Sequence, residues 1–289
     1  LLERKYVIKK LKNFNATIWF SVPSYLIYAK KIFQIIPDDL PNLKKIIFGG
    51  EGYPKNNLKE LFDLTKDKID LFNVYGPTEC TCICSSYKIT EKDFSGKEIE
   101  RLAPIGKKLT KYFCHYLIDK KNNVISKNNI TGELLIGGKN VGIGYLNNNE
   151  LNKEKFIFYK TKNKNNRFYK SGDKFYKDKN GFLYFAGRSD RQIKYNGFRI
   201  ELDEIQNVIN KLDSVDNNYI TYGKKNNNNE ITCWISIKRQ NILINIIKEI
   251  STILPKYMRP KNFIIKSKFP KNSNGKINLK HLSANYYDK

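Results

Sequence analysis

Residues 73–79 read Asn-Val-Tyr-Gly-Pro-Thr-Glu, and this stretch decides how the first half of the chain is interpreted. It continues an apolar run that begins at Ile69, so the sequence predicts a buried strand that ends in a Gly-Pro turn. Backbone N–H groups, a hydroxyl and a carboxylate would then converge beyond the sheet edge, where they suit a nucleotide phosphate and its metal ion. By itself the stretch fits an ordinary strand-to-loop turn equally well.

The segments before this stretch alternate between strand and helix. The predicted order is a buried strand at 17–22, a helix at 25–36, a strand at 45–48, a helix at 58–64 and a strand at 69–74. This βαβ order predicts a parallel, doubly wound sheet, which binds ligands in the loops beyond the carboxyl ends of its strands.

The pattern changes after about residue 100. Short strands at 113–118, 133–136 and 182–185 are separated by Gly and Asn turns, which indicates a β-barrel or a distorted sheet.

A second change follows residue 188. A helix at 202–212, a strand at 231–238, a helix at 242–254 and a strand at 263–267 predict a small α+β domain, with a solvated hairpin tip at 224–229. The expected fold class is therefore α/β followed by α+β, with domains at 1–188 and 189–289.

The composition is that of a folded protein. Of its 289 residues 40% are hydrophobic and 13% aromatic, which is too many for a disordered chain. No apolar run approaches the roughly 18–20 residues of a membrane span, and the first residues show no signal-peptide pattern. Five cysteines in a chain of this length form no disulfide framework, so a cytoplasmic location is expected.

The net charge of +25 raises the question of nucleic acid. The lysines are spread almost evenly and no nucleic-acid-binding motif accompanies them, so no nucleic-acid partner is expected. Nucleotide phosphates or an acidic carrier protein fit the charge equally well.

The cysteines and histidines carry no recognisable site. Cys80, Cys82 and Cys84 are expected to lie on a strand and to point to one face, but no histidine or C-x-x-C pair completes a metal site. His115 and His281 are the only histidines, which argues against His-based acid–base or triad chemistry.

Seven further short segments accompany residues 73–79. They lie at 48–51, 131–138, 142–146, 169–173, 187–194, 197–201 and 274–276. In order and spacing, from about residue 15 to residue 281, they resemble the core motifs of the adenylate-forming superfamily, which includes peptide-synthetase adenylation domains, acyl-CoA synthetases and luciferases. Residues 17–25, 41–44 and 254–260 resemble the amino-acid-activating members, particularly the D-alanine–carrier protein ligases.

The resemblance implies a fold and a reaction. The chain would hold the C-terminal part of the large domain, with αβ layers and a β-barrel, and then a mobile C-terminal domain. The implied reaction joins an amino acid or small carboxylic acid to ATP, with magnesium, as an acyl-AMP. The acyl group then passes to the phosphopantetheine thiol of a carrier protein. An acyl-CoA synthetase-like ligase, or a truncated non-catalytic remnant or binding module, remains an alternative.

The resemblance also implies roles for individual residues. The implied catalytic residues are Lys276, Thr78, Glu79 and Lys194, with Glu79 binding magnesium. The implied nucleotide-binding residues are Gly50, Glu51, Asn73, Tyr75, Gly76, Asp173 and Arg188. The implied substrate pocket contains Ser21, Ile47, Gly49, Val74, Cys82 and Ile83, and the implied hinge is Asp190.

These roles make physical sense. The two carboxylate oxygens of Asp173 suit two ribose hydroxyls, although a turn-capping Asp is the ordinary alternative. The charge of Lys276 would offset the negative charge that gathers when a carboxylate attacks the α-phosphate. Lys194 and Gly197 would face the site after a domain rotation, for thioester formation.

Two departures from the family pattern stand out. D-alanine ligases usually carry Cys where this chain has Gly49, which is expected to leave more room in the pocket. The family's glycine- and Ser/Thr-rich phosphate loop, and the aspartate that holds the α-amino group, match no pattern in the chain and are expected upstream of residue 1. The sequence therefore resembles a fragment, a split-gene product or a decayed copy.

Overall fold

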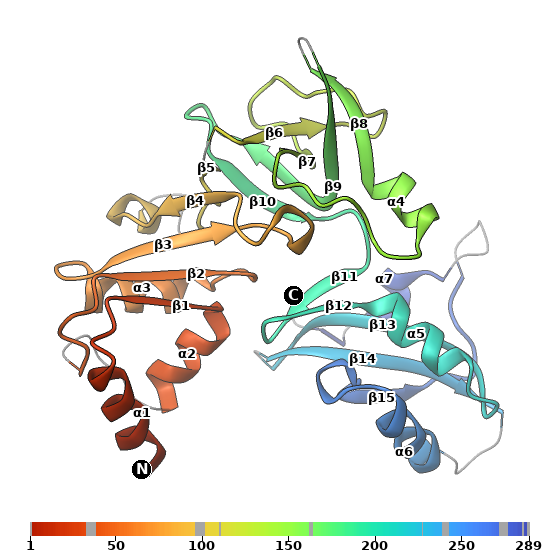
Figure 1. Ribbon diagram of the computed structural model, residues 1–289. Helices are drawn as coiled ribbons and strands as arrows, with labels where there is room; N and C mark the ends of the chain where they lie inside the picture. The colour runs from red at the N-terminus through yellow and green to blue at the C-terminus, as the bar shows by residue number, and fades with distance from the viewer. Residues whose placement is uncertain are drawn as a thin grey trace. The chain divides into compact units, whose positions relative to one another are not determined.

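The computed structural model describes residues 2–32, 39–95, 102–109, 111–161, 164–226, 228–238, 243–271, 277–284 and 286–287. The chain divides into two compact units, Leu1–Asp190 and Arg191–Lys289, and each is described by itself (Figure 1). Among the helices of the described ranges, none is long and apolar enough to cross a membrane.

The first unit opens with α1 (Leu2–Asn13) and a five-stranded sheet of order β1-β2-β3-β4-β5. Its elements are β1 (Ile18–Ser21), α2 (Pro23–Ile32), β2 (Lys45–Gly49), α3 (Lys55–Thr65), β3 (Asp70–Tyr75), β4 (Ser85–Lys88) and β5 (Lys107–Lys108). The strands β1 to β3 are parallel, whereas β4 and β5 are antiparallel. The predicted alternation of parallel strands and helices is confirmed, and the antiparallel extension was not predicted.

Among the described residues, helices pack on one face of β1 to β3. Ile46 and Leu71 on that face form a core with Leu26 of α2 and Leu58 of α3. Apolar residues at helical spacing, such as Leu58 with the partly buried Leu61 and Phe62, explain why α3 covers this face.

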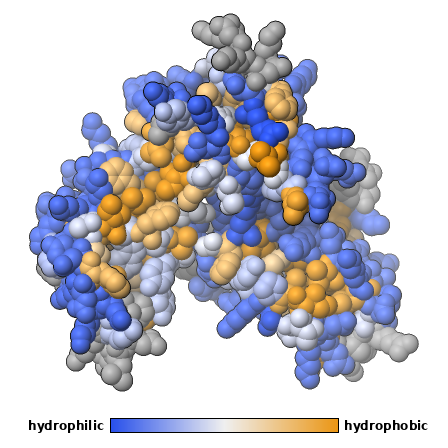
Figure 2. All heavy atoms as spheres, in the orientation of Figure 1, coloured by the Kyte–Doolittle hydropathy of each residue, from blue (hydrophilic) through white to orange (hydrophobic). Residues whose placement is uncertain are grey.

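The opposite face of the sheet is open at β1. Ile18 and Phe20 are 56% and 55% exposed, and apolar side chains reach the surface in this region (Figure 2). The prediction of a buried strand at 17–22 is therefore wrong for this face, because β1 is an edge strand and no described element covers Ile18 and Phe20. Parallel strands are usually covered on both faces.

An antiparallel sheet of order β10-β9-β7-β6, with β8 paired to β9, completes the first unit. Its elements are β6 (Phe113–Ile118), β7 (Gly132–Gly138), α4 (Asn149–Lys155), β8 (Phe156–Thr161), β9 (Lys164–Lys177) and β10 (Leu183–Arg188). Phe175 and Leu134 share a core with Tyr75, which joins the two sheets. The predicted strands are confirmed, but β8 and β9 were missed because the sequence around 160–166 is rich in Lys and Asn.

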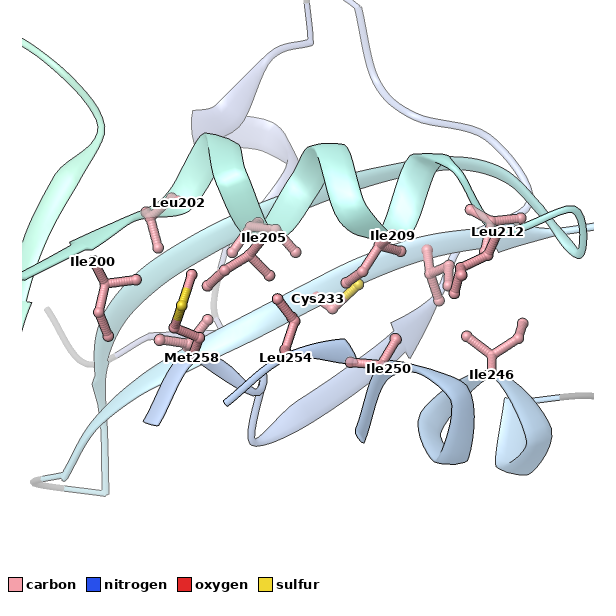
Figure 3. Packing of buried hydrophobic residues seen from close by; sticks show 14 residues of the cluster. Ile200, Leu202, Ile205, Ile209, Leu212, Cys233, Ile246, Ile250, Leu254 and Met258 are labelled. Atoms are coloured by element: carbon pink, nitrogen blue, oxygen red, sulfur yellow. The ribbon is translucent and has the colours of Figure 1, made fainter. Parts of the chain in front are cut away.

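The second unit is α+β, as predicted. Its elements are β11 (Gln192–Tyr195), β12 (Phe198–Glu201), α5 (Leu202–Asn210), β13 (Val215–Lys225), β14 (Asn228–Ile237), α6 (Leu243–Ile253), β15 (Asn262–Ile265) and α7 (Leu279–Leu282). Figure 3 shows Ile205 and Ile209 of α5 pointing toward Cys233 of the sheet, with Ile246 and Ile250 of α6 in the same core. The spacing of four residues places each pair on one helix face.

Candidate active site

The loop after β3 folds back tightly on Gly76. A Cβ added at Gly76 would lie 2.0 Å from the carbonyl oxygen of Cys82, so the position accepts glycine only. The loop contains the short helix η2 (Thr78–Cys80), followed by Thr81 and Cys82 with φ values of 61° and 69°. Left-handed conformations of this kind are uncommon for residues other than glycine and concentrate at functional sites.

Gly76→Ala is expected to lower the free energy of unfolding by about 1–3 kcal/mol, since the new methyl group must displace the backbone at Cys82. Urea unfolding measures the change. Gly142→Ala is the matched control, because a Cβ there lies 3.3 Å from the nearest atom, the carbonyl oxygen of Glu79. Equal stability of Gly76→Ala and the unaltered chain would contradict the tight loop.

The three neighbouring cysteines do not share a strand, so that prediction is wrong. Cys80 ends η2, Cys82 is exposed in the loop, and Cys84 is buried before β4. The left-handed turn at Thr81 and Cys82 separates them. Burial raises the pKa of Cys84 to about 12 and also raises the pKa of Cys80, so both buried thiols stay protonated. Within the described ranges no group of three or more His, Cys, Asp and Glu residues could hold a metal ion.

Asp173 of β9 lies at the centre of a polar cluster in the first unit. Its Oδ2 accepts a hydrogen bond of 2.6 Å from the hydroxyl of Tyr75, and its Oδ1 pairs with Nη1 of Arg188 in β10. The side chain is buried, with the residue 2% exposed. Burial, and then the charge and hydrogen bond of Asp173, raise the pKa of Tyr75, so the tyrosine is a hydrogen-bond donor.

The side chain of Arg188 pairs with two carboxylates, those of Asp173 and Asp190. Its Nε and Nη2 donate to Oδ1 and Oδ2 of Asp190 at 2.7 Å and 2.8 Å, which is a bidentate pair. Burial lowers the pKa of Arg188, but the hydrogen bonds and charges of Asp190 and Asp173 outweigh it and raise the pKa overall. The guanidinium of Arg188 thus links the carboxylate of Asp173 in β9 to the carboxylate of Asp190.

Residues 171–173 form an irregularity within β9 that positions Asp173 beside Arg188. Gly172 has φ of 72°, and a Cβ there would lie 2.6 Å from Oδ2 of Asp190 and 2.8 Å from Nη2 of Arg188. Ser171 Oγ donates to the carbonyl of Leu134 at 2.8 Å and accepts from the backbone N–H of Asp173 at 3.1 Å. The Ser-Gly-Asp sequence therefore fixes the carboxylate beside Arg188.

Glu79 makes hydrogen bonds to the loop that contains Gly142 and Tyr145. Its Oε1 accepts from the hydroxyl of Tyr145 at 2.5 Å, and its carbonyl accepts from the N–H of Gly142 at 2.8 Å. Glu79 is half-buried and Thr78, at the start of η2, is exposed. Sequence reasoning did not assign a role to Tyr145, although its position in the segment 142–146 was a signal.

Other predicted nucleotide-binding residues have structural partners. The amide of Asn73 donates to the carbonyls of Ala103 and Pro104 at 3.3 Å and 3.0 Å. Glu51 accepts from the backbone N–H of Ser24, near the start of α2, at 2.7 Å. Gly50, with φ of 90°, links β2 to Glu51.

The structure brings part of the predicted substrate pocket together. Ile47 and Gly49 are two residues apart on β2, so they lie on the same face of the sheet. Val74 of β3 pairs with Gly49 and lies on that face too. Ser21 lies on the other face, where its Oγ accepts from Nε1 of Trp19 at 2.9 Å. Ile83 packs close to Gly76, where an added Cβ would lie 2.7 Å from its Cα.

The extra room expected at Gly49 is not there. A Cβ at this residue would lie 2.3 Å from the carbonyl oxygen of Val74 and 2.8 Å from its Cγ2. Strand β3 therefore approaches the backbone of Gly49 closely, and the absent side chain leaves no empty space at this residue.

The two predicted catalytic lysines belong to the second unit. Lys194 lies in β11, paired with Arg199 of β12 in a hairpin whose turn contains Asn196 and Gly197 with φ of 50° and 81°. Lys276 lies outside the described residues.

Sequence comparison identifies relatives of the chain. A family model described as AMP-binding enzyme matches residues 2–146. A D-alanine–D-alanyl carrier protein ligase of Bacillus cytotoxicus is 32% identical over 285 residues, which is 96% of this chain and 54% of that protein. The corresponding ligase of Bacillus anthracis is 30% identical over 285 residues, with the same coverage. The chain thus spans about half the length of these relatives.

Comparison with solved structures shows the same fold. The Vibrio cholerae adenylation domain AlmE, in complex with glycyl-adenosine-5′-phosphate, superposes with a TM-score of 0.77 at 23% identity, over 93% of this chain and 50% of that one. The amide bond synthetase McbA of Marinactinospora thermotolerans gives a TM-score of 0.81 at 14% identity, over 99% of this chain and 55% of that one.

Proposed function

The chain belongs to the family of AMP-binding enzymes, and from this premise we propose that it is the C-terminal part of a ligase that activates a small amino acid with ATP as an aminoacyl-AMP. The observation that carries the proposal is the Tyr75–Asp173–Arg188 cluster, in which a buried carboxylate follows Ser171 and Gly172 of the motif. The relatives named as D-alanine–D-alanyl carrier protein ligases support an amino acid as the substrate.

In the proposed site Asp173 binds the ribose hydroxyls. Each carboxylate oxygen can accept more than one hydrogen bond, so both can take a hydroxyl beside their partners Tyr75 and Arg188. Asp173 is 2% exposed and pairs with Arg188, so we propose that the side chain of Arg188 shifts when the ribose binds. Asp190 retains Arg188 during that shift, through the bidentate pair.

Glu79 is the proposed magnesium ligand. Magnesium is usually held by one or two carboxylates together with water and substrate phosphates, and Glu79 supplies a half-buried carboxylate in the loop after Gly76. Magnesium would neutralise charge on the phosphates. Thr78 and the backbone after Gly76 would orient the phosphate beside it. Lys276 is the proposed catalytic residue that stabilises negative charge during acyl-AMP formation.

We propose that the units act as a partial large domain at 1–188 and a mobile domain at 189–289, with Asp190 as the hinge. Lys194, on the β11–β12 hairpin, would serve the second half-reaction, in which the acyl group passes to the phosphopantetheine thiol of a carrier protein. The carrier protein named in the relatives supports this partner.

The open face of the first sheet supports a larger ligase. The relatives are about twice as long as this chain, and Ile18 and Phe20 expose an apolar strand that parallel sheets normally cover. Further polypeptide of the ligase fold would pack on that face.

Asp190→Asn is expected to weaken the hold on Arg188, because an amide offers one acceptor oxygen where the carboxylate offers two. In the native gene product KM for ATP should rise about threefold to tenfold while kcat changes less, since Asp190 acts through Arg188. Asp203→Asn removes a carboxylate that pairs with a different arginine, Arg191, and is the matched control. Unchanged KM in Asp190→Asn, or an equal rise in the control, would contradict the positioning role.

Calorimetry with AMP and with a stable aminoacyl-AMP analogue tests the proposal on residues 1–289 directly. Binding of both, lost in Asp173→Ala, supports the nucleotide site. Binding by a native gene product that shows no ATP–pyrophosphate exchange would favour a non-catalytic binding module. Absence of binding by the folded chain would contradict the proposed site.

A further inference from the structure

A cavity in the first unit is lined by none of the residues assigned to the nucleotide. Its volume is about 490 Å³, which is within the range of about 300–1,000 Å³ typical of small-molecule sites. Its walls come from β5, β6, the end of β9 and the start of β10, together with the segment 124–126. Neither Asp173 nor Glu79 lines it.

His115 of β6 lines the cavity with an imidazole whose ring nitrogens are buried. By strand alternation it shares the inward face with Phe113 and Leu117, which are 3% and 5% exposed. Both ring nitrogens of His115 are buried, and neither has a hydrogen-bond partner in the described part of the chain. A neutral imidazole has one donor and one acceptor, and each unmade buried bond costs about 1–3 kcal/mol. Such groups in folded proteins usually meet water, an ion or a ligand.

The charge on the cavity walls is positive. Lys107 and Lys108 of β5 and Lys177 of β9 line it, and none of its described lining residues is Asp or Glu. Lys107 Nζ lies 4.9 Å from the ring centroid of Phe182. Burial, and then the charge of Lys108, lower the pKa of His115 to about 4. At neutral pH the imidazole is therefore neutral and can donate one N–H.

The remaining walls are apolar. Leu117, Leu134 and Leu183 line the cavity beside the polar groups. A ligand with one charged end and a short apolar body would match both parts of the lining. A purely inorganic ion would leave the leucine walls without contact.

We propose that this cavity binds a small organic anion, whose carboxylate or phosphate group contacts the lysines and the N–H of His115, with its apolar body against the leucines. None of the residues assigned to the nucleotide lines this cavity. The acceptor oxygens of the anion satisfy the buried N–H, and its charge offsets the three ammonium groups.

NMR of the histidine ring nitrogens tests this proposal, because the chain has only two histidines. His281→Asn leaves His115 as the single imidazole signal. Addition of butyrate or of a short alkyl phosphate at pH 7 should move that signal saturably, with a dissociation constant of about 1 mM or lower. The bound anion favours the protonated ring, so the pKa of His115 should rise by about one unit or more.

Two lysine variants locate the anion. Lys108→Met keeps an apolar stem and should weaken binding at least about fivefold, by loss of one charge–charge contact. Lys111→Met, at a lysine that does not line the cavity, should bind as the parent chain does. Response to butyrate alone would identify a carboxylate site, and response to the phosphate alone a phosphate site. No response to either, or equal binding in both variants, would overturn the proposal.

His115→Val separates binding from folding. Valine suits a buried strand position and removes two unsatisfied polar atoms. The variant should lose anion binding, measured by calorimetry, with no loss in the free energy of unfolding. Retained binding in His115→Val would show that His115 is not part of the site and would overturn its role.

Discussion

Asp173→Ala is expected to lower ATP–pyrophosphate exchange of the native gene product by about 100-fold to 1,000-fold, which corresponds to about 3–4 kcal/mol of lost transition-state stabilisation. The proposed contacts between Asp173 and the ribose hydroxyls are hydrogen bonds to a charged group, worth about 1.5–3 kcal/mol each. Loss of the carboxylate also releases Arg188, whose position depends on it. The effect should appear in kcat/KM for ATP.

The same substitution removes a structural partner, so stability has to be measured beside activity. Breaking a buried ion pair from one side destabilises a protein by about 3–5 kcal/mol, and Asp173 pairs with a partly buried Arg188. Tyr75→Phe removes the 2.6 Å hydrogen bond but keeps the carboxylate. It should cost about 1 kcal/mol of stability and lower exchange far less than Asp173→Ala does, because the aromatic ring assigned to the nucleotide is kept.

Asp63→Ala is the matched control for Asp173→Ala, because this exposed carboxylate pairs only with Lys59 on the surface of α3 among the contacts that the structure describes. It should change neither exchange nor stability appreciably. A folded Asp173→Ala variant with full exchange activity would contradict the assignment of the ribose site. Equal losses in Asp173→Ala and Tyr75→Phe would show that Asp173 acts through folding alone.

Lys276→Ala is expected to reduce exchange by about 100-fold to 1,000-fold, as removal of a preorganised donor at a developing charge typically does. Binding of AMP should be nearly unchanged, because Asp173 and Arg188 hold the nucleoside. The effect should therefore lie in kcat, since the proposed contact is made mainly while the acyl-AMP forms.

Lys271→Ala provides the control for Lys276→Ala. Lys271 is an exposed lysine of the same C-terminal segment, at an isolated β-bridge with Ile277. It should retain exchange activity close to that of the native protein. Exchange that is undiminished in Lys276→Ala, or that falls equally in Lys271→Ala, would remove Lys276 from the proposed catalytic group.

The sequence predicted the strands and helices whose position follows from a local pattern of apolar residues. Apolar runs located β2 and β3, and the four-residue spacing of Ile205 and Ile209 located α5. The same method missed β9, whose early residues are Lys and Asn, because its strand conformation depends on pairing with β7 and β8. Tertiary pairing overrides local preference in such segments.

The candidate site was predictable as a set of motifs but not as a set of contacts. Tyr75 and Asp173 are 98 positions apart in the chain, and the sequence carries no sign that one hydroxyl donates to the other. At Gly49 the absence of a side chain predicted extra space, but Val74 occupies the position where a side chain would lie. The strand predicted for the three cysteines failed because Thr81 and Cys82 adopt left-handed conformations that residue type alone did not indicate.

Amino-acid-dependent ATP–pyrophosphate exchange in the native gene product tests the central proposal most directly. Candidate acids should include D-alanine, glycine, other small uncharged amino acids, fatty acids and aryl acids. We expect exchange that requires a small uncharged amino acid, because the residues proposed for the pocket, Ile47, Gly49 and Val74, carry no charge. Exchange supported only by fatty or aryl acids, or by none of the acids in a protein that binds AMP, would contradict an amino-acid-activating ligase.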